Sequence, residues 1–385
     1  MVRLIYDLQI TGHHTEYISY LVDYLVEIRQ KDKCFFVVSE ELLEKFPEIV
    51  EKTKENNNLQ WQFISTTEVA KIKSLSLKKR SFAEYALVEK QAELLSATHV
   101  ILMYFNSFQL SLIFKRPEFT ISGILFLQFY RMKTENLKER VKYLRKYWNT
   151  KFYCRNKQIG KVFVLNDKKT VEFLNKEFNV GIFQMLLDPV PDLKPAKKFD
   201  IRKVYGIESG RKIFLHFGSL DERKGTLDIL HSIPSIEEEQ QKKICFLFAG
   251  KTPESFTHIF TDTIHYYKQH SSVQIVYENR FVENSTMKSL FDQCDCVLIP
   301  YKNTESSSGV LGHAVAAGKP VIGKNLGLLG ELIKENDLGI VINSPDELSG
   351  SIVNFLSNTD GSQAVNNLFL SQRSVNSFAK NILDV

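Results

Sequence analysis

The sequence predicts an α/β protein made of two doubly wound domains, each a parallel sheet covered by helices on both faces. Short apolar runs alternate with helical stripes of apolar residues, and this alternation starts again after residue 200. The proline-punctuated stretch LDPVPDLKP, residues 187–195, separates the two halves and suits neither a helix nor a central strand. We therefore expect a first domain over 1–186, a linker over 187–196 and a second domain over 197–363.

The order of the expected elements supports this fold class. In the first half, strands are expected at residues 4–8, 34–38, 100–104, 124–127 and 162–165. A helix between the first two of these carries Tyr17, Leu21, Tyr24 and Ile28 at helical spacing. In the second half, strands are expected at 213–217, 244–249, 273–277, 296–300, 320–323 and 339–342. Two open sheets of this kind place ligands in a cleft, outside the carboxyl ends of their strands.

The composition is that of a globular cytosolic protein. Hydrophobic residues make up 43% of the chain and charged residues 25%, and no apolar run reaches the length of a spanning helix. The start of the chain, MVRLIYDLQ, does not resemble a signal peptide. Five cysteines form no framework, and the Cys294–Cys296 pair lacks a second ligand pair, so we expect buried thiols in a reducing compartment. The net charge of +5 is too mild to indicate nucleic-acid binding.

The most specific segment lies at residues 301–330. After an expected strand it contains a loop, a helix, a short strand and a glycine-rich turn. Ser306, Ser307, Ser308 and Gly309 fall at the start of the helix, where free backbone N–H groups and the helix dipole favour an anion such as a diphosphate. The alternative is that the serines only cap the helix.

A second segment, FGSLDERKG at 217–225, directly follows an expected strand. Gly218 allows close approach of the backbone, and Arg223 and Lys224 are suited to clamping phosphates. The alternative is an ordinary solvated pair of basic side chains.

A third segment, ITGHHTE at 10–16, follows the first expected strand and places Gly12 and His13 at a strand-to-helix turn. The pattern GxGxxG is absent here, which argues against a dinucleotide-dependent dehydrogenase. The alternative for His13 is a surface histidine without a role.

Taken together, these segments resemble the retaining glycosyltransferases of family 4. The resemblance is carried by the loop 218–225, by LIPY at 298–301, and by ESSSGVLGHAVAAGKPVI at 305–322, which follows the family pattern ExxxGxxxEAxAxGxPVI except at the second glutamate. In weaker form it covers nearly the whole chain. It implies the GT-B fold, in which two Rossmann-like domains face each other across a cleft and a C-terminal helix, here about 364–385, packs back on the first domain.

The resemblance also implies the roles of individual residues. Glu305 would hold hydroxyls of the donor sugar, and His13 would lie near the reacting centre, so these two are the candidate catalytic residues. The donor and its phosphates would contact Gly12, Gly218, Arg223, Lys224, Ser307, Ser308, Gly309, Val310 and His313. Two positions depart from the family pattern. His313 stands where a second glutamate usually binds the ribose, and Ser219 stands where many members carry an arginine.

The implied activity is a hexosyltransferase-like transfer from a nucleotide-sugar donor to a sugar or lipid-linked glycan, with retention, in polysaccharide or glycoconjugate biosynthesis. No DxD-type carboxylate pair occurs in a suitable loop, so cations and a helix N-terminus would stabilise the leaving group, with no cofactor and no metal. Three alternatives remain: a sugar-nucleotide epimerase or hydrolase, a phosphorylase-like enzyme, and a non-catalytic scaffold with the same fold.

Basic residues are concentrated in the first half of the chain. Residues 131–157 hold ten Lys and Arg against two Glu, and residues 71–80 hold five against none. Leu137, Val141, Leu144 and Trp148 form one helical stripe, which Lys138, Lys142 and Arg145 flank and to which Tyr143 and Tyr147 add amphipathic rings. Two interpretations stay open: a cytoplasmic protein peripheral on the anionic inner face of the plasma membrane, or an ordinary helix packing this stripe on its own domain.

Overall fold

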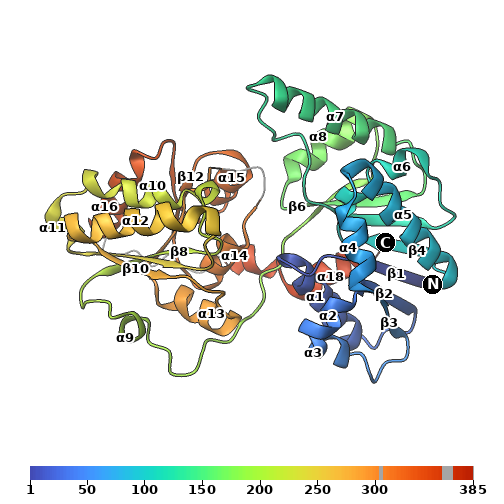
Figure 1. Cartoon of the computed structure of the whole chain (residues 1–385), viewed down its shortest axis with the longest axis horizontal. Coiled ribbons are helices and arrows are strands. Elements are labelled where there is room, and N and C mark those ends of the chain that lie inside the picture. Colours follow the sequence, from blue (N-terminus) through green and yellow to red (C-terminus); the bar gives the residue numbers. More distant parts are fainter. Residues whose placement is uncertain (303–306, 358–366, 385) are drawn as a thin grey trace. The chain divides into compact units, whose positions relative to one another are not determined.

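The computed structural model of the chain describes residues 1–302, 307–357 and 367–384, and it divides into two compact units (Figure 1). Unit 1 comprises Met1–Asp188 and Val375–Val385, and unit 2 comprises Pro189–Ser374. The boundary at Asp188 lies within the stretch that the sequence predicted to be a linker. Each unit is an open sheet in which every pair of neighbouring strands is parallel.

Unit 1 has a seven-stranded sheet in the order β3-β2-β1-β4-β5-β6-β7. The strands are β1 (Val2–Asp7), β2 (Lys33–Ser39), β3 (Leu59–Ile64), β4 (His99–Leu102), β5 (Thr120–Leu125), β6 (Ile159–Leu165) and β7 (Phe183–Leu186). The helices are α1 (His13–Glu27), α2 (Glu40–Lys45), α3 (Pro47–Glu51), α4 (Thr66–Ser74), α5 (Leu77–Leu94), η1 (Phe105–Ser107), α6 (Ser111–Phe114), α7 (Leu137–Tyr153), α8 (Lys168–Phe178) and α18 (Val375–Leu383).

Alternate residues of the central strands separate the two cores of unit 1. In β1, Ile5 faces a core shared with α1, α2, α3 and α18, whereas Leu4 faces a core shared with α4 to α8. This alternation of buried residues on both sides explains why the central strands read as continuous apolar runs. Phe378 of α18 packs on Tyr17 of α1 with ring centroids 4.6 Å apart, so the C-terminal helix belongs to the core of unit 1.

Unit 2 has a six-stranded sheet in the order β10-β9-β8-β11-β12-β13. The strands are β8 (Lys212–Phe217), β9 (Ile244–Ala249), β10 (Gln274–Glu278), β11 (Cys296–Ile299), β12 (Val321–Lys324) and β13 (Gly339–Ile342). The helices are α9 (Ile201–Tyr205), η2 (Glu222–Lys224), α10 (Thr226–His231), η3 (Ile233–Ser235), α11 (Glu238–Gln241), α12 (Glu254–His270), α13 (Asn284–Gln293), α14 (Gly309–Ala316), α15 (Gly327–Glu335), α16 (Glu347–Ser357) and α17 (Asn367–Ser371). One core lies under α13, α14 and α15, and the other under α10, α12 and α16.

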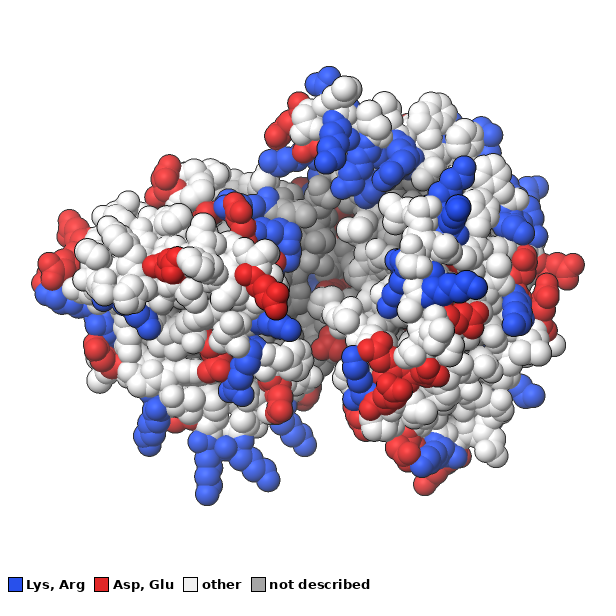
Figure 2. All heavy atoms as spheres, viewed as in Figure 1, with Lys and Arg blue, Asp and Glu red and all other residues white. Residues whose placement is uncertain are grey.

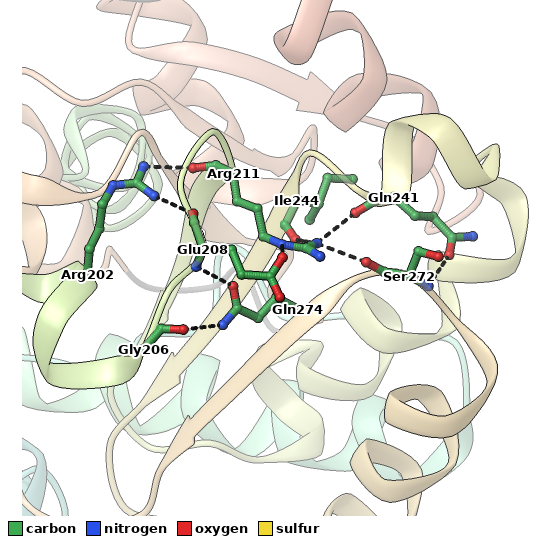
Figure 3. A network of polar contacts seen from close by, with 8 residues as sticks. All are labelled: Arg202, Gly206, Glu208, Arg211, Gln241, Ile244, Ser272 and Gln274. Carbon is green, nitrogen blue, oxygen red and sulfur yellow. Dashed lines mark hydrogen bonds and ion pairs between the residues drawn. The ribbon is translucent and has the colours of Figure 1, made fainter.

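A polar network closes the amino edge of the unit 2 sheet (Figure 3). The Arg211 guanidinium donates to the carbonyls of Gln241, Ile244 and Ser272 at 3.2, 2.9 and 2.9 Å, and its Nε donates to Glu208. These carbonyls precede or begin the neighbouring strands β9 and β10. One partly buried arginine therefore satisfies backbone groups at the edge of the sheet where the strands begin.

Four features differ in detail from the sequence predictions. Strands β3 and β7 were not predicted. The glycine-rich turn predicted at the end of the 301–330 segment is the first turn of α15, which begins at Gly327. The predicted C-terminal helix consists, over its described part, of α17 in unit 2 and α18 in unit 1. The prediction of buried thiols is confirmed for Cys34, Cys245, Cys294 and Cys296, whereas Cys154 is only partly buried. Burial raises the pKa of Cys294 to about 12.

Candidate functional site

The carboxyl edge of the unit 2 sheet brings two of the predicted segments together. Strand β8 lies between β9 and β11, so the strand order reverses at this point and the following connections leave in opposite directions. In doubly wound sheets such a switch point forms the ligand crevice. The loop 218–225 follows β8, and the loop that begins at Pro300 follows β11.

Backbone contacts hold these two loops against each other. The amide of Lys302 donates to the carbonyl of Arg223 at 2.8 Å. Gly225 adopts φ +69°, and a Cβ added there would lie 2.3 Å from the Pro300 carbonyl oxygen. Only glycine accommodates both this conformation and this approach, which is why the segment ends in Lys-Gly.

Lys224 is held across its own loop. Its Nζ lies 3.4 Å from the Phe217 carbonyl and 5.1 Å from the ring centroid of Tyr301. A Cβ added to Gly218, which has φ +105°, would come within 2.6 Å of this Nζ. Gly218 therefore leaves room for the lysine amine, which stays half-buried beside the strand end. Asp221 stabilises the loop because its carboxylate accepts a hydrogen bond from the Lys224 amide at 2.9 Å.

Arg223 points differently from Lys224. Its side chain is 53% exposed, and Nη2 lies 3.4 Å from Asp221 Oδ2, so most of its donors face solvent. Ser219 also contacts this carboxylate, at 3.3 Å. The segment thus presents an exposed guanidinium, which is suited to bidentate contacts, and a half-buried ammonium group.

Two further lysines extend this basic edge, and sequence reasoning missed them. Lys302 follows β11 and lies 3.2 Å from Asp228, and Lys324 ends β12 and lies 3.7 Å from the same carboxylate. The side chain of Asp228 is only 11% exposed. Each of the two lysines is the first charged residue after an apolar run, and that position was the signal that could have found them.

The start of α14 lies at the same edge. Ser308 occupies the N-cap position, but its side chain makes no capping hydrogen bond, and its Oγ lies 3.4 Å from the Tyr301 hydroxyl. The alternative that the serines only cap the helix is therefore wrong for Ser308. Because Oγ does not take the amides of the first turn, beginning with Gly309 and Val310, these amides keep the anion-binding potential of a helix N-terminus.

The other predicted residues of this segment occupy different surroundings. The side chain of Val310 is buried in the unit 2 core, so only its backbone is available to a ligand. His313 lies one turn further along α14, beside the ring of Phe291 at 5.7 Å. Ser307 is half-exposed just before the helix. Glu305 lies outside the described residues.

His216 of β8 links this strand to β11 and to the start of α10 at the switch point. Its Nδ1 lies 2.9 Å from the Leu298 carbonyl on β11, and Nε2 lies 3.0 Å from the Thr226 hydroxyl at the start of α10. Complete burial lowers the pKa of His216 to about 4, so the ring is neutral at pH 7. A carbonyl can only accept, and Nδ1 therefore carries the proton of the neutral ring.

In unit 1, the third predicted segment also lies at a carboxyl edge. Gly12 has φ +65° and precedes α1 without a side-chain cap. The side chain of His13 is 51% exposed, stacks on Tyr17 at 5.8 Å and lies 3.4 Å from Glu16. The segment thus lies at a strand-to-helix turn as predicted, and the contact of His13 with Glu16 is exposed to solvent.

The adjacent His14 is more firmly held, and sequence reasoning did not select it. Its Nδ1 lies 2.7 Å from Oδ2 of Asp7, whose side chain is 1% exposed at the end of β1. The rings of Tyr104 and Phe126, which follow β4 and β5, lie 5.5 Å from the imidazole. The sequence did hold a signal for this pair, because Asp7 is a carboxylate at the end of the first apolar strand.

The hydrogen bond to Asp7 leaves the other ring nitrogen of His14 for a ligand. Asp7 accepts, so Nδ1 of a neutral ring donates, and Nε2 becomes a hydrogen-bond acceptor. No hydrogen bond to Nε2 is found among residues 1–302, 307–357 and 367–384. The arrangement of a buried carboxylate, an oriented imidazole and two aromatic rings suits a hydroxylated ligand.

Comparison with known proteins gives a family match for the unit that carries the basic edge. Residues 211–358 match the protein family described as "Glycosyl transferases group 1". That range contains the β8 loop, the β11 loop and α14. Solved structures match the whole chain: HepE from Anabaena in complex with UDP has a TM-score of 0.69, with 14% identity and coverage of 100% of this chain and 99% of that one. WaaG, a glycosyltransferase involved in lipopolysaccharide biosynthesis, has a TM-score of 0.67, with 16% identity and complete coverage of both chains.

The fold is GT-B. This confirms the fold class predicted from the sequence. Two curated relatives carry glycosyltransferase names. "Uncharacterized glycosyltransferase MJ1607" of Methanocaldococcus jannaschii is 26% identical over 169 residues, which are 43% of this chain and 41% of that protein. "Putative glycosyltransferase YtcC" of Bacillus subtilis is 27% identical over 217 residues, which are 54% of this chain and 49% of that protein. The matched part therefore spans about half the length of these relatives.

Two further properties of the described ranges bear on function. Their helices include none with the combined length and apolar character needed to cross a bilayer. Within the same ranges, no three or more His, Cys, Asp or Glu side chains are grouped so that they could hold a metal ion.

Proposed function

We propose that this GT-B protein transfers a sugar from a nucleotide-sugar donor to an acceptor hydroxyl, with retention of the anomeric configuration and without a bound metal. The observation that carries the proposal is the basic carboxyl edge of unit 2, where Arg223, Lys224 and the uncapped start of α14 lie at the switch point. The match of residues 211–358 to a glycosyltransferase family supports it.

Unit 2 would hold the donor. Lys224 and the amides at the start of α14 would bind the diphosphate, and Arg223 would leave Asp221 to join them, because bidentate charge-assisted contacts to phosphate are stronger. These groups would stabilise the charge that develops on the departing diphosphate. Glu305 would hold hydroxyls of the donor sugar, and His313 would contact the nucleotide. UDP is the first nucleotide to test, because HepE is solved in complex with UDP and with UDP-glucose.

Unit 1 would hold the acceptor. His14, oriented by Asp7, would accept a hydrogen bond from an acceptor hydroxyl through Nε2, with Gly12 and His13 beside it at the start of α1. The leaving diphosphate would help to deprotonate the reacting hydroxyl on the same face of the sugar, so no protein nucleophile is assigned. The acceptor would be a sugar or a lipid-linked glycan in polysaccharide or glycoconjugate synthesis at the cytoplasmic face of the plasma membrane. The role of WaaG in lipopolysaccharide biosynthesis supports this class of pathway.

The test is calorimetric titration of the full chain with UDP, GDP, ADP and TDP, with Arg223→Ala and Lys224→Ala as variants. Each variant should lose about 1.5–3 kcal/mol of binding free energy, the range for a charge-assisted hydrogen bond. Lys203→Ala is the matched control, because Lys203 is an exposed lysine of unit 2 on α9, which precedes β8. Unchanged affinity in both variants would show that this loop does not bind the donor.

Product analysis separates the alternatives. Transfer requires that nucleotide release depends on the acceptor. Release without acceptor would indicate a hydrolase or epimerase, use of a sugar phosphate would indicate a phosphorylase-like enzyme, and failure to bind any of the four nucleotides would indicate a scaffold.

A further inference from the structure

Helix α7 of unit 1 exposes a stripe of large apolar side chains. Exposed fractions are 78% for Leu137, 58% for Val141, 52% for Leu144, 46% for Trp148 and 37% for Phe152. At 100° per residue these five side chains fall within an arc of about 80° on one side of the helix. We call them the α7 stripe. Soluble surfaces expose single apolar side chains commonly, but a continuous row of five marks an interaction surface.

The α7 stripe does not hold the helix onto its own unit. That role belongs to the opposite side, where Tyr143 and Tyr147 pack edge-on against the buried ring of Phe129 at 5.2 and 5.7 Å. Tyr153 and Thr150 are buried on this inner side as well. Packing of the stripe on its own domain, one of the two interpretations of the sequence, is therefore wrong. The two tyrosines belong to the core side and not to the outer surface.

Basic side chains border the stripe on both sides. By helical geometry Lys138, Lys142 and Arg145 lie along one flank, and Arg140 and Lys151 lie along the other. Figure 2 shows Lys and Arg side chains gathered over α7. The one acidic residue of the helix, Glu139, accepts from the Glu135 amide at 2.9 Å and lies on the inner side of the wheel. No acid thus interrupts the outer face of α7.

Cations and aromatic rings are combined within this surface. Lys151 Nζ lies 4.9 Å from the Trp148 ring centroid, and the Arg155 guanidinium lies 5.4 Å from that of Phe152. The rings of Trp148 and Phe152 stack at 5.8 Å. Amphipathic aromatic rings beside long basic side chains are the anchors that proteins use at the bilayer interface.

The neighbouring helices α6 and α5 also expose apolar side chains next to basic ones. Helix α6 packs beside both α7 and α5, and it ends at Phe114, which is exposed and precedes Lys115 and Arg116. Leu77 at the start of α5 is also exposed, next to Lys78 and Lys79. Of the basic run at 71–80, only Arg80 is engaged by a nearby carboxylate, Glu84 at 2.7 Å, within the described part of the chain.

We propose that the α7 stripe docks unit 1 on an anionic lipid surface. The stripe would enter the boundary between headgroups and acyl chains, and the flanking Lys and Arg would contact anionic headgroups. The core of a protein interface is depleted of lysine, whereas lysines border this stripe along its length, so a lipid surface fits better than a protein partner. The proposal deepens the proposed function by naming the surface that would bring unit 1 to a membrane-borne acceptor, and it can be tested without any donor or acceptor.

The experiment measures co-sedimentation of the full chain with vesicles of phosphatidylcholine, with and without about 30% phosphatidylglycerol, at 0.1 and 0.5 M salt. We expect binding to the anionic vesicles alone, reduced at high salt. Leu144→Ser with Trp148→Ser, and separately Lys138→Glu with Lys142→Glu and Arg145→Glu, should each weaken binding at least tenfold. The matched control is Ile259→Ser with Lys203→Glu, which changes exposed apolar and basic residues of unit 2.

Tryptophan fluorescence provides a second readout. Emission of Trp148 should shift to shorter wavelength on anionic vesicles, whereas Trp61, which donates to the Thr53 hydroxyl at 2.8 Å, should not respond. Because the substituted side chains are exposed, all variants should keep wild-type thermal unfolding and nucleotide affinity, which separates this proposal from the donor site. Binding to no vesicle, or binding that neither variant weakens, would overturn the proposal. A dimer in the absence of lipid that the Leu144 and Trp148 variant dissociates would identify a second copy as the partner instead.

Discussion

At the carboxyl end of β1, one hydrogen bond distinguishes two adjacent histidines. The sequence favoured His13, because the family resemblance falls on Gly12-His13. The structure holds His14 against the buried carboxylate of Asp7 and leaves His13 half-exposed beside Glu16. A buried carboxylate fixes the ring orientation and tautomer of its histidine, and a side chain fixed in this way is better placed to act on a ligand.

We therefore predict that His14→Ala lowers kcat/KM for the acceptor about tenfold, the effect of losing a hydrogen bond worth roughly 1.5 kcal/mol. Asp7→Asn should produce a similar loss, since Asn can bond the wrong imidazole tautomer. Steady-state kinetics with varied acceptor measure the effect, and calorimetry should show unchanged nucleotide affinity in unit 2. A loss in His13→Ala that His14→Ala does not share would return the role to His13.

At the scale of elements, the structure shows why β3 and β7 were not predicted. They are the two edge strands of the unit 1 sheet. Strand β3, LQWQFI, alternates apolar and glutamine residues, and β7, FQML, has only four residues with Met185 exposed. Edge strands bury less surface, so they lack the continuous apolar runs that identified the central strands.

A buried ion pair fixes the loop before α7 to the start of α8. Arg131 donates from Nε and Nη2 to both oxygens of Asp167, at 2.6 and 2.9 Å, and both side chains are buried. Asp167 also caps α8 by accepting from the Thr170 amide at 3.0 Å. Burial alone would raise the pKa of Asp167, but the hydrogen bonds from Arg131 and Thr170 outweigh burial and lower it.

Removing one partner of this pair should be costly. Arg131→Met would leave the Asp167 carboxylate buried without its cation, and we expect the free energy of unfolding to fall by about 3–5 kcal/mol. Urea unfolding followed by circular dichroism measures this change. Lys168→Met, at an exposed position of α8, serves as the control and should change stability by less than about 0.5 kcal/mol. Equal stability of the two variants would refute the role given to the pair.

At the scale of the whole molecule, burial keeps a histidine neutral in both units, His99 in unit 1 and His216 in unit 2. His99 of β4 and His216 of β8 both have their pKa lowered from 6.5 to about 4, chiefly because burial disfavours the charged ring. The unfolded chain takes up these protons as the pH falls below about 6.5, whereas the folded chain does not. The two neutral histidines therefore do not reduce the free energy of unfolding above pH 6.5. Below that pH the free energy of unfolding decreases, until the pH reaches about 4.

The expected loss of unfolding free energy is on the order of 3 kcal/mol for each histidine, because its pKa differs by about 2.5 between the folded and the unfolded chain. We predict that the urea midpoint decreases steadily between pH 7 and pH 4. His216→Gln should lower stability at pH 7 but make the pH dependence shallower, because one titrating group is gone. Proton NMR of the imidazole C2–H signals should show both rings neutral at pH 6. A constant midpoint between pH 7 and pH 5 would contradict the prediction.

The sequence by itself determined the fold class, the six strands of unit 2 and the two loops that meet at β8 and β11, because apolar periodicity and glycine-punctuated strand ends are local properties of the chain. Only the tertiary structure decided which side chains share a site. Lys302 and Lys324 join Asp228, and His14 joins Asp7, through neighbouring strands and turns whose side-chain directions no spacing specifies. The tertiary structure also decided that the α7 stripe faces outward, because an amphipathic pattern states that one side is apolar but not which side the core occupies.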